Sequence, residues 1–410
     1  AHSWARREGS GSRCWWRGQR PSKWRDMKYR STALLTLAHT ATDVNQGAIP
    51  VLLPFFIAQH NLTYAAAAVI VFTTTFVSTI TQPVFGIVAD RLSRPWLMPF
   101  GVLLAGLGLS CVGLAPTYET GLIAVALSGI GVAAFHPEGA RLANRFAGDK
   151  KATIMSIFAT GGQLGFAIGP LIATFALLKW GIKGTAFMAV PAIGVTLLIA
   201  FILPGLWKSY GGVGVKAKQA SDGVDFWGAF VLLSVLVLFR SVIFYGINTF
   251  LPLFWINVLS QTKAAGASAL TVFFASGVVG NLLGGRIADQ VGLRGAVLVE
   301  FAILSVLFPI FAYLSNPLWA MLMLVPIALM NSASVGPLLV LGQSYLPNRI
   351  GLASGVTLGL AFSFGGTTTP FFGWIADNYG LRTAIVVLSL LPLVCTGLTA
   401  FLPKPKTAGA

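Results

Sequence analysis

Two stretches of the sequence, GIVADRLSR (Gly86–Arg94) and GRIADQVGLR (Gly285–Arg294), share a glycine and an Ala-Asp pair at an offset of 199 residues, and each closes with an arginine. Around them the chain repeats again, because Ala152–Pro170 matches Leu352–Pro370 at an offset of 200. Repeated halves are typical of transporters, in which the substrate binds near the membrane midplane between them. The repeat therefore predicts a chain built from two related halves.

The composition places this repeat in a membrane. The 410 residues are 55% hydrophobic and 10% charged, with a mean hydropathy of +0.78, whereas a soluble domain is about 25% charged. Runs of about 20 apolar residues cross a bilayer as helices. We expect an all-α transmembrane fold of twelve helices in two pseudo-symmetric six-helix bundles. The expected spans are 32–58, 64–89, 96–115, 118–139, 152–178, 184–204, 227–258, 266–288, 295–314, 317–340, 351–376 and 383–402.

The polar stretches divide the chain into four parts. Residues 1–26 contain seven Lys and Arg, four Trp and no apolar run, and Met27 follows them directly. Because a signal peptide needs an apolar core, we expect a non-native or disordered leader over 1–26. The N-terminal bundle is then expected at 27–206, a linker at 207–225 and the C-terminal bundle at 226–410.

The formal charge of +16 reports on membrane orientation. Of the 21 Lys and Arg residues from Met27 onward, sixteen fall on one side of the predicted spans and four on the other, and Arg240 lies within a span. Basic loops mark the cytoplasmic side. We therefore expect a multi-pass protein of the bacterial inner membrane, with both termini cytoplasmic and no nucleic-acid partner.

The first repeated stretch resembles the loop motif of the major facilitator superfamily, in which Asp-Arg follows a glycine and an arginine closes the motif. The resemblance covers residues 30–402 and implies a secondary transporter. It also implies an inter-bundle latch made by Asp90, Arg91, Arg94 and the second-half Asp289. The alternative is that these four residues lie in solvated turns, where the arginines only mark the cytoplasmic side of the membrane.

Three further stretches resemble the fosmidomycin-resistance branch of that superfamily: HTATDVNQG (39–47), QPVFG (82–86) and FHPEGARLA (135–143). Members of this branch are proton-driven exporters of small polar or anionic compounds, including phosphonate antibiotics. The chain departs from the superfamily pattern at Ser93, Val125 and Ser156, where glycine, arginine and glycine are usual. The last departure shortens the antiporter motif of the fifth span.

Asp43 is the predicted proton carrier, with His39 as its partner. The two residues are four apart, so they share one helix face. Gln46 continues that face, and we expect it to bind substrate. Intramembrane acids are costly and normally face a polar cavity, and a histidine titrates in the physiological range. The alternative is a polar cluster that only packs two helices.

His136, Glu138 and Arg141 form the second predicted cluster, around Pro137. We expect His136 to face the substrate path and Glu138 with Arg141 to form an inner gate. A structural ion pair between these two residues is the alternative.

Arg240 is the one basic residue deep in a predicted span, beside the repeat counterpart of Asp43. We expect it to bind an anionic substrate and to act as counter-ion to Asp43, with Tyr245 and Asn248 on the same helix face lining the site. The alternative is that the Arg240 side chain snorkels, so that its guanidinium group reaches the membrane–water interface. Glu300 is expected to face the inner-leaflet interface.

Several chemistries are excluded by missing motifs. The chain has no Gly-x-x-x-x-Gly-Lys-Ser/Thr loop, no His-Glu-x-x-His and no Cys-x-x-Cys. We therefore expect no ATP, no metal and no cofactor besides the proton gradient. The predicted function is proton-coupled efflux by alternating access, carried out by a monomer that binds a small polar or anionic substrate and protons. Proton-coupled uptake of an organic acid is the alternative, followed by an intramembrane enzyme or sensor.

Overall fold

The computed structural model describes residues 22–92, 96–147, 151–209 and 223–404, apart from some side chains beside the gaps. These residues form helices and contain no strand. The longer helices are α1 (Ser22–His60), α2 (Tyr64–Leu92), α3 (Leu97–Val112), α4 (Tyr118–Ala147), α5 (Lys151–Trp180), α6 (Ala189–Ser209), α7 (Trp227–Asn257), α8 (Lys263–Val291), α9 (Leu293–Tyr313), α10 (Pro317–Ala333), α11 (Val335–Tyr345), α14 (Thr369–Tyr379) and α15 (Leu381–Phe401). Short turns complete the path: η1 (Gly181–Met188), η2 (Pro347–Arg349), α12 (Ile350–Ser354), η3 (Gly355–Leu360) and α13 (Ala361–Thr367).

Each predicted span coincides with helix, and the predicted all-α transmembrane fold is confirmed. Eight helical stretches of the described residues are long and apolar enough to cross a membrane, and one of them, Ile154–Gly205, contains both α5 and α6. The shorter α3 is also apolar. The exact number of twelve crossings stays a prediction, because α1 and the stretch 350–379 are helical but not among these apolar stretches.

Two predicted spans are broken rather than continuous. The tenth divides at Ser334 into α10 and α11, because Pro337 supplies no N–H to the preceding turn. The eleventh passes through α12, a wider π-helical turn at η3 and α13 before α14 begins. Interrupted helices are tolerated in membranes where the freed backbone lines protein or a cavity.

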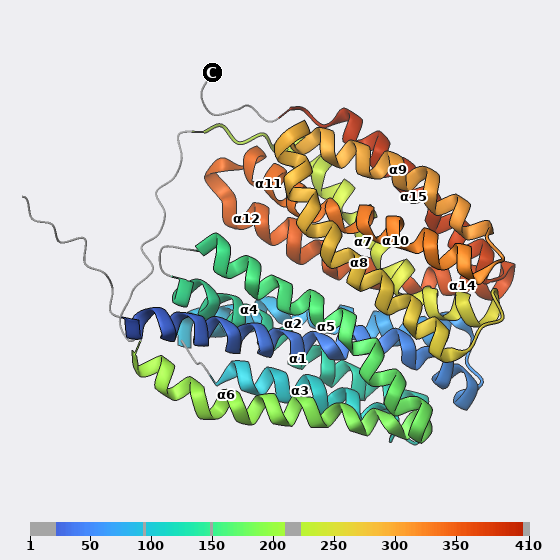
Figure 1. The fold of residues 1–410 in the computed structure, drawn as a ribbon, viewed down its shortest axis with the longest axis horizontal. Coiled ribbons are helices and arrows are strands. Elements are labelled where there is room, and N and C mark those ends of the chain that lie inside the picture. Colours follow the sequence, from blue (N-terminus) through green and yellow to red (C-terminus); the bar gives the residue numbers. More distant parts are fainter. Residues whose placement is uncertain (1–21, 93–95, 148–150, 210–222, 405–410) are drawn as a thin grey trace, which may run out of the picture.

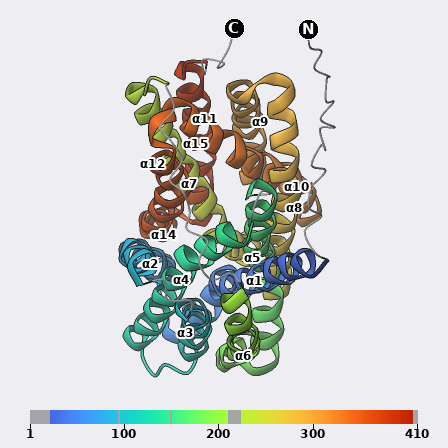
Figure 2. The ribbon, with the colours of Figure 1, turned by 90° about the vertical axis from the view of Figure 1, so that its left-hand side faces the viewer.

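The two halves of the chain lie side by side as separate groups of helices. Figure 1 shows α1–α6 as the lower group and α7–α15 as the upper one, and Figure 2 shows the same division from the end. Helices α5 and α8 pack against each other across the boundary, and so do α2 and α14. The predicted domain limits at 206 and 226 are not tested by this arrangement and stay predictions. Helix α1 begins at Ser22, within the predicted leader.

Small residues bring α1 and α5 into close contact. A Cβ on Gly161, Gly165 or Gly169 would lie within 2.6 Å of a backbone oxygen of α1. The spacing of four puts these glycines on one face of α5, and small residues at that spacing are how membrane helices approach closely. This contact places α5 directly against the polar residues of α1.

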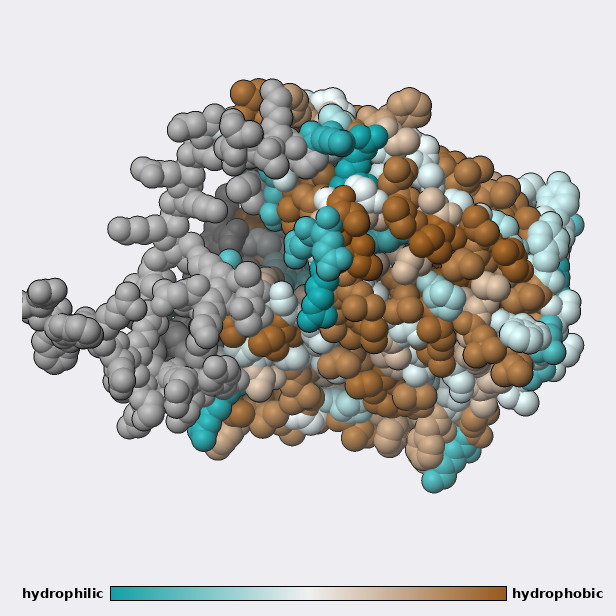
Figure 3. All heavy atoms as spheres, turned by 45° about the horizontal axis from the view of Figure 1, so that its top comes forward, coloured by the Kyte–Doolittle hydropathy of each residue, from teal (hydrophilic) through white to brown (hydrophobic). Residues whose placement is uncertain are grey.

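The outer surface is apolar over the sides of the molecule. Figure 3 shows hydrophobic side chains over most of the described face in that view. Side chains on several helices point outward, including Phe201, which is 88% exposed, and Phe401, which is 80% exposed. A soluble monomer rarely exposes such a large apolar surface, so these side chains face lipid.

Candidate functional site

Asp43 lies between two histidines inside the N-terminal helices. Its Oδ2 is 3.2 Å from Nε2 of His39, one turn earlier on α1, and its Oδ1 is 3.2 Å from Nε2 of His136 on α4. Asp43 is only 4% exposed. The structure thus joins the predicted proton carrier and its predicted partner, and it adds His136 to the same cluster.

The hydrogen bond on the far side of His39 determines how protons are arranged. Nδ1 of His39 lies 2.7 Å from the backbone carbonyl oxygen of Phe158. A carbonyl can only accept, so Nδ1 carries the proton, and in a neutral imidazole Nε2 is then an acceptor. Nε2 nevertheless faces a carboxylate oxygen. One additional proton therefore belongs to the His39–Asp43 pair, either on the imidazole or on the carboxyl group.

Helix α5 fixes this cluster by close packing. The ring of Phe158 stacks on His39 with centroids 4.3 Å apart. Gly162 lies one turn further on α5, and a Cβ at this position would be 2.6 Å from both Asp43 Oδ2 and His39 Nε2. The space that Gly162 leaves is therefore part of the site.

We expect Gly162→Ala to impair transport and destabilise the protein by about 1–3 kcal/mol, the usual cost of overpacking. The added methyl group must displace His39 or Asp43 and so disturb the shared proton. Transport rate and thermal unfolding in detergent measure the two effects. Gly194→Ala on α6 is the matched control, because a Cβ there meets nothing within 4 Å. Equal behaviour of the two variants would contradict this role of Gly162.

The same three residues are close enough to bind a metal ion. One ligand atom from each of His39, Asp43 and His136 lies within 4.8 Å of the others. The bond from His39 Nδ1 to a backbone carbonyl is also the kind of partner that metal-bound histidines have. The expectation that the chain uses no metal therefore stays a prediction, and the effect of EDTA on transport tests it.

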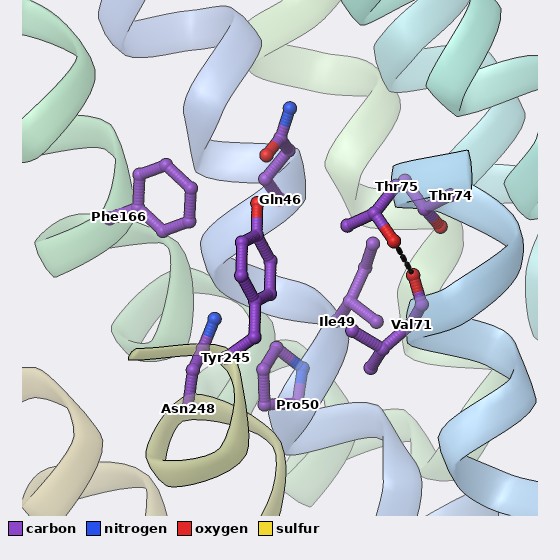
Figure 4. Close-up of a pocket in the computed structure, with 9 residues that line it drawn as sticks. All are labelled: Gln46, Ile49, Pro50, Val71, Thr74, Thr75, Phe166, Tyr245 and Asn248. Atoms are coloured by element: carbon purple, nitrogen blue, oxygen red, sulfur yellow. Dashed lines mark hydrogen bonds between the residues drawn. The ribbon is translucent and has the colours of Figure 1, made fainter. Parts of the chain in front are cut away.

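A small pocket lies beside this cluster, between the two halves. Figure 4 shows the Tyr245 ring in the pocket beside Gln46 and Asn248, with Phe166 on one side and the threonines of α2 on the other. Three predicted substrate residues therefore come together: Gln46, Tyr245 and Asn248. The full lining is Gln46, Ile49, Pro50, Val71, Thr74, Thr75, Phe166, Tyr245 and Asn248.

The lining of this pocket is uncharged and combines apolar side chains with a few polar ones. Asn248 is 2% exposed, and its Oδ1 accepts no hydrogen bond from the described residues. Pro50 lacks an N–H, which leaves the carbonyl of Gln46 without its usual donor from the helix. The side-chain oxygen of Asn248 can therefore accept a hydrogen bond from a bound molecule.

Arg240 lies outside this lining. Its NH2 group donates to the Asn331 carbonyl oxygen at 3.0 Å, and its Nε donates to Ser334 Oγ at 3.0 Å. Both acceptors lie at the end of α10, where a cation favours the helix dipole. Arg240 is 8% exposed, so it does not snorkel. Its predicted contacts with substrate and Asp43 stay predictions, because Asp43 faces the histidines here.

The family model of the Major Facilitator Superfamily matches residues 35–370. The chain belongs to this superfamily. It is therefore a membrane transporter for a small molecule and not an enzyme.

Comparison with individual proteins refines the resemblance. This superfamily member is 29% identical over 386 residues to the uncharacterized MFS-type transporter YfnC of Bacillus subtilis, covering 91% of this chain and 92% of that one. It is 28% identical to the fosmidomycin resistance protein of Escherichia coli, with the same two coverages. The predicted likeness to the fosmidomycin-resistance protein is confirmed.

Solved structures show the same fold. A bacterial homolog of the human lysosomal transporter Spinster, in an inward-facing and unoccupied conformation, has a TM-score of 0.77 at 17% identity, covering 93% of this transporter and 99% of that chain. The nucleoside transporter NupG has a TM-score of 0.72 at 13% identity, covering 91% and 100%. Both likenesses extend over nearly the whole chain.

The structure describes the predicted gate residues, but only part of the predicted latch. The ion pair of Glu138 with Arg141 is present, with Oε1 2.6 Å from NH2 and Oε2 2.9 Å from Nε; its gating role stays a prediction. Asp289 is exposed on α8. The side chains of Asp90 and Arg91, and the whole of Arg94, lie outside the described residues.

Asp377 is a contact between the halves that the sequence did not reveal. From α14 its Oδ1 and Oδ2 accept hydrogen bonds from the first backbone N–H groups of α2, those of Tyr64 at 2.7 Å and Ala65 at 2.9 Å. Helix starts leave such groups without partners, and a carboxylate satisfies both. Nearby, Gly373 allows close contact, since a Cβ there would be 2.6 Å from Ala65 Cα.

We expect Asp377→Asn to favour opening of the transporter at this end, because an amide offers one oxygen in place of two. Loss of a helix cap costs about 1 kcal/mol, which is roughly a fivefold change in a conformational equilibrium. Labelling of a cysteine introduced at Ala66 measures the opening. Asn378→Ala is the control, since Asn378 bonds within its own helix to Trp374. Unchanged labelling in Asp377→Asn would contradict the contact.

Proposed function

We propose that this transporter exports a small polar or anionic molecule in exchange for protons, by alternating access. The observation that carries the proposal is the buried His39–Asp43 pair, in which the contact of His39 Nδ1 with Phe158 O leaves Nε2 facing the carboxyl group. A proton-driven exporter needs a buried group that gains and loses a proton near the substrate. The pocket at Gln46 begins one turn along α1 from Asp43.

The proton and the substrate compete in this mechanism. His136 is partly exposed and contacts Asp43, so it connects the buried carboxyl group with the open side of the cluster. When substrate occupies the pocket, the additional proton leaves Asp43 or His39. When the substrate departs, the proton returns and favours the opposite conformation, since a ligand shifts an equilibrium only by its difference in affinity for the two states.

The direction of transport is supported by the relatives. Two of them carry resistance in their names: the fosmidomycin resistance protein and a multidrug resistance protein, MdtG of Klebsiella pneumoniae, which is 24% identical over 82% of this chain and 84% of that one. A transporter that confers resistance does so by removing the compound from the cell. Export by this transporter agrees with those names, and proton-coupled uptake of an organic acid is the alternative.

Everted membrane vesicles containing the full chain test the proposal, with fosmidomycin and a panel of carboxylic acids as probes. A pH gradient that is acidic inside should drive accumulation of a probe, and nigericin, which removes the gradient, should abolish it. Accumulation only under the opposite gradient would show symport and overturn the antiport assignment. Loss of transport with EDTA at constant pH gradient would show a metal at the His39–Asp43–His136 cluster.

A further inference from the structure

The second half of the transporter contains a buried polar cluster at the repeat counterpart of the first. Asp43 on α1 contacts His136 beside Pro137 of α4, while Arg240 on α7 contacts Asn331 and Ser334 beside the break of α10. Helices α7 and α10 are the repeat counterparts of α1 and α4. Each half therefore buries one ionisable side chain where its first helix meets its proline-containing fourth helix, an acid in the first half and a base in the second.

Glu300 on α9 is the unexplained member of the second cluster. It is 2% exposed, which corrects the expectation that it faces the inner-leaflet interface. Neither of its carboxyl oxygens has a hydrogen-bond partner among the described residues. Asn331 is fully buried, and its side-chain oxygen and nitrogen are likewise without partners among those residues. Buried polar atoms normally have partners, so this group has a binding capacity that the present conformation does not use.

The electrostatic surroundings of Glu300 are simple. Helix α9 packs against α8, α10, α11 and α15, and α10 brings no titratable side chain. The charge that acts on Glu300 is that of Arg240 on α7. Two titratable residues on α9 and its neighbours are Cys395, which is buried near Arg240, and Tyr345, whose hydroxyl donates to the Pro403 carbonyl. The others lie toward the helix ends: Lys263, Arg286, Asp289, Arg294, Tyr313 and Arg382.

The protonation state of Glu300 follows from this environment. A buried carboxylate without a donor or an ion pair costs several kcal/mol, whereas a carboxylic acid costs much less. Arg240 bonds to neutral acceptors on α10 and lies beyond ion-pair distance of Glu300 in the described structure. Glu300 is therefore a carboxylic acid in this conformation.

We propose that Glu300 is a second proton-binding site of the transporter, which alternates with Arg240 during the cycle. In the present conformation the proton is on Glu300, and Arg240 holds the end of α10. In the opposite conformation the Glu300 O–H bond breaks, the proton passes to water, and the carboxylate pairs with Arg240 as the guanidinium leaves Asn331 and Ser334. This inference rests on proton coupling as proposed above and assigns one proton site to each half.

The break between α10 and α11 gives this exchange a mechanical consequence. While Arg240 bonds to Asn331 and Ser334, it satisfies acceptors at the end of α10. Pairing with Glu300 removes those bonds and frees the break to change its angle. Loss of the Glu300 proton is thereby linked to movement of α11 relative to α10.

Infrared difference spectroscopy of the purified full-length protein in lipid tests the site without a substrate. The wild type should show a carboxylic-acid C=O band at neutral pH that disappears in alkaline buffer, and Glu300→Gln should lack it. Asp43→Asn should keep this band, and Glu119→Gln, which alters an exposed acid, should behave as wild type. An unchanged band in Glu300→Gln would overturn the proposal.

Distances between spin labels at Asn144 on α4 and Ser344 on α11, both exposed, test the conformational link. With Cys14 and Cys111 replaced by serine, the wild-type distances should change with pH. Glu300→Gln imitates the protonated form, so its distances should lose at least half of that change, and Glu119→Gln should keep all of it. A full pH response in Glu300→Gln would overturn the link to α10.

The two proposals fail in different ways. If Asp43→Asn retains coupled transport while Glu300→Gln loses the carboxylic-acid band, the assignment of Asp43 is wrong and that of Glu300 holds. If Asp43→Asn loses coupling while the band is unchanged in Glu300→Gln, proton coupling holds and the second site is wrong. With both sites correct, Glu300→Gln should halve the number of protons exchanged per molecule transported.

Discussion

Asp43→Asn is expected to abolish transport driven by a pH gradient while leaving the protein folded. The amide has nearly the same shape as the carboxyl group, so contact with His39 and His136 remains possible. The amide cannot take up or release a proton at physiological pH. The pair with His39 therefore no longer holds the additional proton that the bond from His39 Nδ1 to the Phe158 carbonyl requires. We expect gradient-driven flux to fall roughly tenfold or more, which corresponds to about 1.4 kcal/mol or more of lost coupling.

Counterflow measured without a pH gradient separates coupling from binding in this variant. Because substrate exchange needs no net proton movement, Asp43→Asn should retain counterflow while its gradient-driven flux is lost. Glu119→Gln makes the same chemical change at an exposed acid near the start of α4 and should retain both activities. Normal gradient-driven flux in Asp43→Asn would show that the proton is carried elsewhere.

Arg240→Met is expected to give a large loss of stability. The variant removes two hydrogen bonds from a charged group, to the Asn331 carbonyl and to Ser334 Oγ, each worth about 1.5–3 kcal/mol. Methionine fills part of the vacated space, so we expect a net cost of about 2–4 kcal/mol. Thermal unfolding of the purified protein in detergent measures this loss.

Arg294→Met is a matched control for that variant, because Arg294 performs a similar role at a helix end nearer the surface. Its Nε and NH2 donate to the carbonyl oxygens of Thr399 and Ala400 in the last turn of α15. A cation near an exposed helix C-terminus contributes about 0.3–1 kcal/mol. Equal losses in the two variants would contradict a special role for Arg240 at the α10 break.

Part of the candidate site followed from the sequence because its residues are close along one helix. His39, Asp43 and Gln46 are spaced to share a face of α1, and the same holds for Glu138 and Arg141 on α4. Periodicity predicts neighbours within a helix. It does not predict partners across helices, so the contact of His136 with Asp43 and the bond of His39 to Phe158 were not foreseen.

Arg240 and Glu300 show the same limit for buried charges. The sequence indicated that Arg240 was unusual but did not reveal its contacts with Asn331 and Ser334, and it placed Glu300 at a membrane interface. Which direction a side chain faces depends on how helices rotate against one another, and the break at Ser334 turns acceptors of α10 toward Arg240. No role was predicted for Asp377 at the end of the eleventh span, although two backbone N–H groups of α2 donate to it.

The sequence by itself determined the family, the all-helical membrane fold and the short set of charged residues able to work inside it. The chain has few charged residues, and burial of a charge in a membrane is costly. Each charged residue inside a span is therefore a candidate for a functional role. The tertiary structure alone decided which of those charges meet, since close packing through Gly162 and the interruption of α10 arise from contacts between segments far apart in the chain. Proton arrangement depends on such contacts, because a histidine is neutral or charged according to what lies on both sides of its ring.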